Sequence, residues 1–454
     1  MAKLKIRNFG PITTGFNEND GWIEISPVTI FIGNQATGKS TIAKLYATFT
    51  WLEKALVRKD FLPGDLTIDA FKDNYLAYHS IKSYWHENSE IEYIGTAFKF
   101  TIANNKFVTD KISDTYVKPK IGYAPAERNL LSTIPNPDRV PGLLRSLFTY
   151  LADYDEARRF FSGKEIPIID NYSYLYDSST EKTYIISKDK GKKRVELNEA
   201  SSGIQSLVPI SIVSQYYSKH QVERYSSNKQ MLTLHEQKIA EKDYSDLISI
   251  LGVAGAAELI AALTSEKNNG RHAFFGIFSL LGALGLGMSS NSEPKKQLSP
   301  IQSKKLEGEV KEKEKEVQKI IESRFINIVE EPEQNLFPTS QNKILYDLLE
   351  CNNMSADNQL IITTHSPYII AYLILSAKVK NMLERGVDAE KTNHIVPKAA
   401  ATEGDTITIY ETSEVGTITR VKPYKYLPSD DNCLNNAMIK SDEDFSKLLD
   451  IEGD

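Results

Sequence analysis

The feature that most constrains the fold is a glycine loop placed between an apolar strand and a helix. Residues 33–40 read G-N-Q-A-T-G-K-S, which completes the pattern G-x-x-x-x-G-K-S. The preceding run, residues 28–32, is apolar and β-branched and predicts a buried strand, and a helix is expected from Thr41 onward. Glycine lets backbone N–H groups turn toward phosphate oxygens, and a helix start adds a positive dipole end. The sequence therefore predicts a nucleoside triphosphate site.

Two side chains of the loop have specific expected tasks. Lys39 is expected to reach the β- and γ-phosphates, and the Ser40 hydroxyl is expected to bind Mg²⁺. The residues of the loop that we expect to bind the nucleotide are Gly33, Asn34, Gln35, Ala36, Thr37, Gly38, Lys39, Ser40 and Thr41.

Two further predicted strands end in residues that suit phosphate chemistry. The apolar run 325–329 is followed by Glu330 and Glu331, and the apolar run 360–363 precedes His365. A parallel sheet places its chemistry at the carboxyl ends of its strands. We expect Glu330 to hold Mg²⁺ through water, Glu331 to orient or deprotonate the attacking water, and His365 to contact the γ-phosphate. Considered separately, Glu330 and Glu331 could also form an acidic turn after a strand, and His365 could also be a structural histidine.

A turn of small residues opens another predicted helix. Residues 198–213 read N-E-A-S-S-G-I-Q-S-L-V-P-I-S-I-V. Ser201 or Ser202 can cap this helix, and Gly203 follows them, so the amino end of the helix would face an anion. A plain capped helix is the alternative reading of this segment.

Alternating and apolar patterns predict the rest of the secondary structure. Residues 92–102 predict a strand or hairpin, and a helix-like segment at 341–351 separates the strands that end at Glu331 and His365. Two further strand pairs are expected, one over 168–176 and 182–197 and one over 406–411 and 416–421, and an acidic segment ends the chain.

Composition and charge exclude several classes of protein. Hydrophobic residues make up 41% and charged residues 25%, which is typical of a globular protein. A formal charge of −6 argues against a protein that coats nucleic acid by bulk charge, although a local contact remains open. Cys351 and Cys433 form neither a disulfide framework nor a metal spacing, and the first residues lack the apolar core of a signal peptide. We therefore expect a cytoplasmic protein.

The interval 220–323 is expected to be a helical insertion that makes oligomer or partner contacts. Its uncharged stretch 273–288 is shorter than the roughly 20 residues that a membrane span needs, which favours a buried helix. A membrane hairpin with 247–263 is the alternative. The charged helix expected over 300–323 has an apolar face too short for a long coiled coil. A helix that only packs on its own chain is the alternative to one that contacts other subunits or partners.

Taken in order, these segments resemble the ABC-type ATPase heads of SMC proteins, recombination-repair ATPases and the AAA family ATPases of bacterial anti-phage defence. G-N-Q-A-T-G-K-S resembles the Walker A loop, A-S-S-G-I-Q the signature motif, I-V-E-E-P-E the Walker B motif and T-T-H-S-P the histidine switch. K-L-K-I-R-N-F-G-P-I resembles the first strand of such heads, and G-Y-A-P-A-E-R-N, residues 122–129, a segment of the defence branch.

The resemblance implies an α/β fold with a RecA-like mixed sheet flanked by helices, an antiparallel β subdomain and an inserted helical or short coiled-coil subdomain. The implied domains are residues 1–219, the first part of the head, residues 220–323, the insertion, and residues 324–454, the second part of the head. It further implies ATP and Mg²⁺ as cofactors, Glu331 as the catalytic glutamate, and Glu330 where most relatives have aspartate.

The implied mechanism needs two copies of the chain. In such proteins the signature residues, here Ser201, Ser202 and Gly203, meet the γ-phosphate bound by the opposite subunit, whereas His365 meets it in its own subunit. Two departures stand out. No glutamine lies between Gln35 and Gln205, so the A-P-A-E-R turn with Glu127 or Arg128 would have to replace the usual Q-loop. The signature also departs from the commoner L-S-G-G-Q, and we therefore expect slow hydrolysis.

Within this class the chain is most similar to the ATPase subunits of the phage anti-restriction-induced system, PARIS. That similarity implies a homo-oligomeric sensor and scaffold that holds a separate TOPRIM-type toxin or nuclease and releases it when a phage-encoded trigger protein is recognised. The residues after His365 are too few for a TOPRIM domain, so no nuclease site is expected in this chain.

Three alternatives remain at this point. A Septu-type ATPase would work with a separate HNH nuclease. A DNA-repair or chromosome-tethering ATPase would clamp duplex DNA, but the acidic charge and short apolar helix face count against it. The motor subunit of a membrane transporter is disfavoured by the insertion and the missing Q-loop. The basic run 188–194 indicates a solvated hairpin tip more than a nucleic-acid contact.

Overall fold

The computed structural model describes residues 2–134, 137, 140–169, 171–188, 193–219 and 324–453. The predicted insertion, residues 220–323, and the tip of the basic hairpin, 189–192, lie outside the described residues. The chain divides into two compact units, and the larger one consists of Met1–Thr115, Ile121–Ser218 and Phe325–Asp454. The description below is of this larger unit.

A seven-stranded mixed sheet forms the centre of the unit, in the order β2-β16-β15-β4-β14-β13-β8. Strand β4 pairs in parallel with both β14 and β15, β13 pairs in parallel with β14, and β15 and β16 are antiparallel. The strands are β2 (Gly15–Phe16), β4 (Val28–Gly33), β8 (Pro119–Ala124), β13 (Arg324–Glu330), β14 (Gln359–Thr364), β15 (Ile407–Thr412) and β16 (Thr417–Arg420). All residues of β4 and β14 are buried, as expected of parallel strands covered on both faces.

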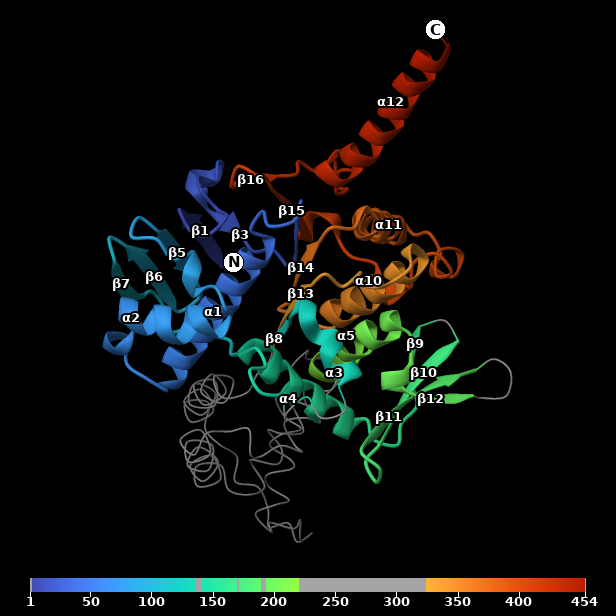
Figure 1. Cartoon of the computed structure of the whole chain (residues 1–454), viewed down its shortest axis with the longest axis horizontal. Coiled ribbons are helices and arrows are strands. Elements are labelled where there is room, and N and C mark those ends of the chain that lie inside the picture. Colours follow the sequence, from blue (N-terminus) through green and yellow to red (C-terminus); the bar gives the residue numbers. More distant parts are fainter. Residues whose placement is uncertain are drawn as a thin grey trace, which may run out of the picture. The chain divides into compact units, whose positions relative to one another are not determined.

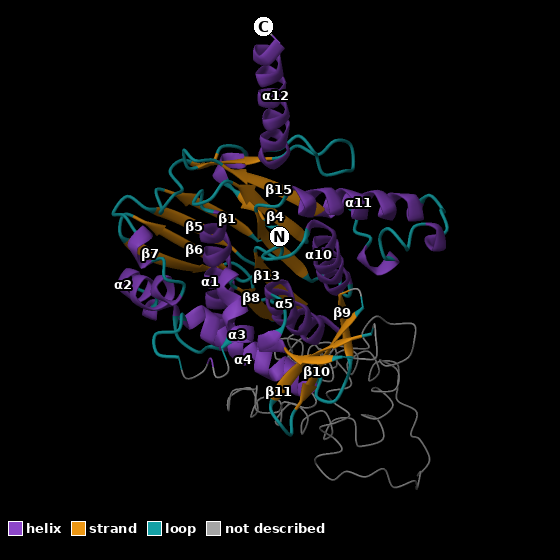
Figure 2. Ribbon diagram, turned by 45° about the vertical axis from the view of Figure 1, so that its right-hand side comes forward, coloured by secondary structure: helices purple, strands orange, loops and turns teal. Residues whose placement is uncertain are grey.

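Helices cover the two faces of this sheet. Helix α1 lies on one side, whereas α5, α10 and α11 lie on the other (Figures 1 and 2). The helices are α1 (Lys39–Arg58), α2 (Ile68–Ala70), α3 (Leu130–Thr133), α4 (Arg145–Phe160), α5 (Ser202–Lys219), α10 (Pro338–Asn353), α11 (Pro367–Glu384) and α12 (Cys433–Gly453). No helix among the described residues is both long and apolar enough to cross a membrane.

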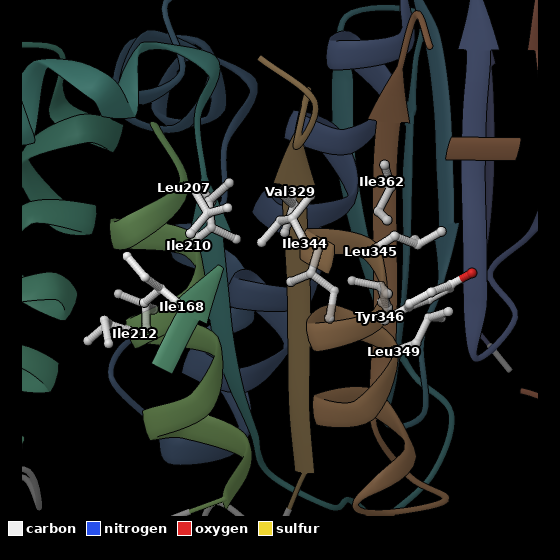
Figure 3. Packing of buried hydrophobic residues seen from close by; sticks show 14 of the residues in the cluster. Ile168, Leu207, Ile210, Ile212, Val329, Ile344, Leu345, Tyr346, Leu349 and Ile362 are labelled. Atoms are coloured by element: carbon white, nitrogen blue, oxygen red, sulfur yellow. The ribbon is translucent and has the colours of Figure 1, made fainter. Parts of the chain in front are cut away.

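The core lies between the central sheet and the helices α5 and α10. Figure 3 shows Leu207 and Ile210 of α5 beside Val329 of β13, with Ile344 and Leu345 of α10 close by. These side chains are at most 1% exposed, and burying an aliphatic side chain of this size stabilises a fold by about 1.5–3 kcal/mol. The core therefore fixes α5 and the strand that carries the acidic pair against each other.

Two antiparallel sheets complete the unit. One has the order β3-β1-β5-β6-β7 and the other the order β12-β11-β10-β9. Their strands are β1 (Lys3–Arg7), β3 (Ile23–Glu24), β5 (Glu90–Ile94), β6 (Phe98–Ala103), β7 (Lys106–Lys111), β9 (Ile166–Ile169), β10 (Tyr172–Asp177), β11 (Lys182–Ser187) and β12 (Arg194–Glu196). A mixed sheet flanked by helices with an antiparallel β subdomain is the predicted α/β, ABC-type head, and this prediction is confirmed.

The predicted strand pair over 168–176 and 182–197 is wrong in detail, because the segment forms the four strands β9 to β12. The register between β9 and β10 shifts between Tyr172 and Ser173. Side chains alternate with a period of two on both sides of a tight turn, so the pattern does not show where one strand ends and the next begins. By contrast, residues 406–411 and 416–421 form the predicted pair, β15 and β16.

Candidate nucleotide-binding site

The glycine loop joins β4 directly to α1. Gly33 and Gly38 have φ values of 142° and 102°, a region that side chains disfavour. A Cβ at Gly33 would lie 2.3 Å from the carbonyl oxygen of Thr412, and one at Gly38 would lie 2.8 Å from Cγ1 of Ile12. The two outer glycines of the pattern are therefore required both by backbone conformation and by close packing.

Lys39 is the first residue of α1 and turns back over the loop. Its Nζ donates to the carbonyl oxygens of Gly33, at 2.9 Å, and Asn34, at 2.6 Å. Burial lowers the pKa of Lys39 to about 8, while the nearby carboxylate of Glu331 opposes the shift. A buried ammonium with only carbonyl partners would gain from an anionic one, so the loop residues fit a phosphate group.

The loop borders a pocket of about 410 Å³, a volume in the range of small-molecule sites. Its walls come from the loop itself, from the segment after β14, from the end of β15 and from the start of α12. The described residues that line it are Gly33, Asn34, Gln35, His365, Glu411, Thr412, Ser413, Glu414, Cys433, Leu434 and Ala437. Asn34 Nδ2 donates to Glu414 Oε1 at 2.7 Å and closes one side of the pocket.

The acidic pair stands where β13 ends. Register pairs Glu330 with Thr363, so the acids and His365 leave neighbouring parallel strands at the same edge of the sheet. The Glu330 carboxylate is buried and accepts hydrogen bonds from the hydroxyl of Tyr123, at 2.7 Å, and from the backbone N–H of Ala126, at 3.3 Å. The Mg²⁺ role of Glu330 stays a prediction, and the residues that hold its carboxylate in place are now identified.

Glu331 and His365 are brought together by the fold. His365 Nε2 lies 3.4 Å from Glu331 Oε1. The pKa of the Glu331 carboxyl lies below its ordinary value, chiefly because of the hydrogen bond with His365, although burial acts in the opposite direction. Glu331 is therefore ionised at neutral pH and able to act as a base toward water. Its backbone is left-handed, with φ of 44°, and its N–H donates to the Thr363 carbonyl oxygen at 2.8 Å.

The signature residues lie at the start of α5. Ser201 and Ser202 are exposed, and none of residues 201–203 is among the described residues that line the loop pocket. Gly203 packs closely on the segment after β13, since a Cβ there would lie 2.7 Å from the carbonyl oxygen of Asn335. A single copy therefore leaves both signature serines exposed at the start of α5.

Arg128, one of the two residues expected to replace the Q-loop, lies between the acidic turn and α5. It is fully buried and donates to the carbonyl oxygens of Glu330, at 2.5 Å, and Glu331, at 2.6 Å. It also donates to the carbonyl oxygens of Pro125, at 3.0 Å, and of Ser206 in α5, at 3.3 Å. Arg128 thus connects the acidic turn to the helix that carries the signature, and Glu127 beside it is exposed.

Glu333 is a residue that the sequence reasoning missed. Its Oε1 accepts hydrogen bonds from the Thr364 hydroxyl and the His365 backbone N–H, both at 2.8 Å. Burial raises the pKa of Glu333, and these hydrogen bonds oppose the rise. Its Oε2 is buried with no hydrogen-bond partner among the described residues. The only sequence signal was a third acid in I-V-E-E-P-E, placed two residues after Glu331.

Comparisons with known proteins bear on this site. The AAA ATPase domain family model matches residues 295–370, a range that contains the acidic pair, Glu333 and His365. None of the curated proteins matches the chain. The family match supports an ATPase.

Several solved structures are similar at low scores. An SMC head domain from Thermotoga maritima has a TM-score of 0.30 and 10% identity, over 82% of this chain and 90% of that chain. An SMC head bound to the C-winged helix domain of ScpA has a TM-score of 0.34 and 9% identity, over 92% of this chain and 96% of that chain. An Smc head with an extended coiled coil, bound to the C-terminal domain of ScpA derived from Pyrococcus furiosus, has a TM-score of 0.32 and 11% identity, over 98% of this chain and 99% of that chain. The fold assignment therefore rests on the sheet order and loop of this chain.

The contacts of Arg128 lead to a prediction about stability. We expect Arg128→Met to lower the free energy of unfolding by about 2–4 kcal/mol, because buried carbonyl oxygens lose their donors. Urea denaturation measures this. Arg159→Met, at an exposed position of α4, serves as the control and is expected to change stability by less than about 0.5 kcal/mol. Equal effects of the two variants would show that the Arg128 contacts contribute little.

The contacts of Glu333 lead to a prediction about activity. We expect Glu333→Ala to slow ATP hydrolysis roughly 10- to 100-fold, because the His365 backbone loses its anchor and the side chain shifts from Glu331. Glu333→Gln keeps an oxygen that can accept both hydrogen bonds and is expected to stay near the parent rate. Phosphate-release assays at saturating ATP measure both variants. If Glu333→Gln is as slow as Glu333→Ala, the loss of activity comes from the lost negative charge, and the proposed anchoring of the His365 backbone is contradicted.

Proposed function

We propose that the chain is an ATP-binding and ATP-hydrolysing sensor and scaffold subunit of a bacterial anti-phage defence complex. It assembles with other copies of itself and holds a separate toxin or nuclease effector until a phage-encoded protein triggers release. The observation that carries the proposal is the division of the nucleotide machinery within one copy. Lys39, Glu331 and His365 gather at one edge of the sheet, whereas Ser201 and Ser202 are exposed at the start of α5.

In this proposal ATP and Mg²⁺ bind at the glycine loop. Lys39 would hold the β- and γ-phosphates, and the Ser40 hydroxyl would hold a magnesium ion, whose charge would offset that of the phosphoryl group. Glu331 accepts a proton from the attacking water, and His365 orients Glu331. Ser201 of a second copy completes the pocket, so that ATP joins two copies and hydrolysis loosens the contact.

The assembly and its effector follow from the resemblance and from this division of the site. A second copy that uses Ser201 would explain why the two serines at this helix start are exposed in their own chain. Arg128 contacts both the acidic turn and Ser206 of α5, which gives nucleotide binding a route to the surface that meets the neighbour. The effector and the trigger are inferred from the resemblance of residues 122–129, G-Y-A-P-A-E-R-N, to a segment of the defence branch.

Removal of the loop lysine tests nucleotide binding. We expect Lys39→Ala to weaken ATP binding at least roughly 10- to 100-fold, because a charge-assisted contact with phosphate contributes about 1.5–3 kcal/mol. Titration with a fluorescent ATP analogue measures the affinity. Lys44→Ala removes a partly exposed lysine from the same helix and is expected to bind ATP normally. ATP affinity equal in Lys39→Ala and the parent would remove the loop from the proposed site.

Removal of the proposed base tests the role of hydrolysis. We expect Glu331→Gln to slow phosphate release roughly 10²- to 10⁴-fold and to leave ATP bound. The ATP-joined assembly should then accumulate, and multi-angle light scattering with ATP and Mg²⁺ should report a larger mass than without nucleotide. Unchanged turnover would exclude Glu331 as the base. A steep salt-dependent affinity for duplex DNA in the same protein would favour the DNA-tethering alternative.

A further inference from the structure

The last helix, α12, carries an apolar face that no described part of the chain covers. All residues from Asn436 to Glu452 are exposed. Met438 is 53% exposed, and Phe445 and Leu448 are each 62% exposed, values unusual for such large apolar side chains. In both views α12 extends away from the central sheet, with its last residues far from every labelled element (Figures 1 and 2).

Four apolar residues of α12 recur with helical spacing, of which Leu434 is partly buried and the other three are exposed. Leu434, Met438, Phe445 and Leu448 follow one another at intervals of four, seven and three residues, so they share one face of α12. Glu443 lies on the opposite face. In proteins most of the stability of a helix comes from the packing of its apolar face. Burying each of these side chains would stabilise an interface by about 1.5–3 kcal/mol.

The first turn of α12 is fixed at the nucleotide pocket. Cys433, Leu434 and Ala437 line that pocket together with Asn34 and His365. The Cys433 backbone N–H donates to Oε2 of Glu411, the residue just before the end of β15, at 3.0 Å. The helix therefore starts at the pocket that, in the proposed function, a neighbouring copy completes.

We propose that α12 is an arm whose apolar face packs on a second copy of this chain. The inference rests on the ATP-joined assembly proposed above and names a surface of that assembly. The arm is acidic, because α12 contains the five acids Asp442, Glu443, Asp444, Asp450 and Glu452 and the two lysines Lys440 and Lys447. Such an arm fits an apolar surface bordered by basic side chains.

The outward face of α11 is a surface of that kind. Tyr368 is 40% and Leu375 is 39% exposed on this helix, and Ala371 between them is exposed as well. Lys378 follows on the same helix and Arg385 lies directly after it, whereas Lys380 pairs with Glu384 at 3.0 Å. The acidic side chains and the apolar face of α12 in one copy thus complement the basic side chains and the apolar face of α11 in the next copy.

Two other coverings fit the charges less well. If α12 paired with α12 of a second copy, Asp442 and Asp444, which flank the apolar face on its two sides, would approach the same carboxylates of the partner. If α12 lay on a membrane, its acidic side chains would oppose anionic lipid headgroups. A separate effector protein is the remaining occupant, and the experiment below distinguishes it.

The test uses the full chain with Glu331→Gln, in ATP and Mg²⁺, and measures mass against concentration by light scattering. We expect the double substitution Phe445→Glu and Leu448→Glu to raise the dissociation constant of the assembly at least roughly tenfold, and Leu375→Glu on α11 to act alike. Ser446→Glu adds one negative charge outside the apolar face and is the control for the effect of a single added glutamate. Since these positions are exposed or nearly so, the thermal midpoint of each chain should not change.

Each outcome decides between the claims. If the variants assemble like the parent, α12 does not pack on a second copy and the inference is wrong. If the parent itself stays monomeric with ATP, the ATP-joined assembly is wrong and the inference falls with it. If the mass is unchanged but the co-expressed product of the adjacent reading frame no longer co-purifies with the α12 variant, the helix binds that effector, and packing on a second copy is contradicted.

Discussion

The parallel pairing of β4 with β14, and of β14 with β13, is the constraint on which the site depends. Because these strands run in the same direction and are buried on both faces, their carboxyl ends meet at one edge of the sheet. The glycine loop follows β4, the acidic pair ends β13, and His365 follows β14. A shift of one residue in any of these pairs would turn the site residues to the other face of the sheet. The buried aliphatic residues that fix the register therefore also set the distances within the site.

Two buried polar side chains hold the segments that leave this edge. Glu333 accepts a hydrogen bond from the backbone of His365 and so places the histidine beside Glu331. Arg128 donates to the carbonyl oxygens of both acidic residues and to Ser206 of α5. Because a buried guanidinium without partners is costly, these carbonyl oxygens and Arg128 stabilise one another's positions. The acidic turn and the start of α5 are in this way parts of one connected structure.

The sequence was sufficient for features that depend on local patterns. The loop with Lys39, the buried strands and the acids at the end of β13 were all placed correctly, because strand burial and glycine spacing are local signals. The partners of Arg128 and Glu333 come from segments distant in sequence, and no local pattern reveals such contacts. The sequence pattern did not separate the four strands β9 to β12, because the turns between them are short. The helix α12 was not predicted, because the last segment was read only as acidic. The roles of Ser201, Ser202 and Gly203 stay predictions.

Mixing two inactive variants tests the shared site most directly. Lys39→Ala damages the loop, and Ser201→Arg damages the exposed serine that a neighbour would use, so neither chain should hydrolyse ATP alone. In a mixed pair, the loop of the Ser201→Arg chain meets the intact signature of the Lys39→Ala chain, and one complete pocket is restored. We predict that mixing the two chains recovers ATP hydrolysis. If the mixture stays as inactive as its components, each copy uses its own signature residues, and the account of ATP as the joint between copies is contradicted.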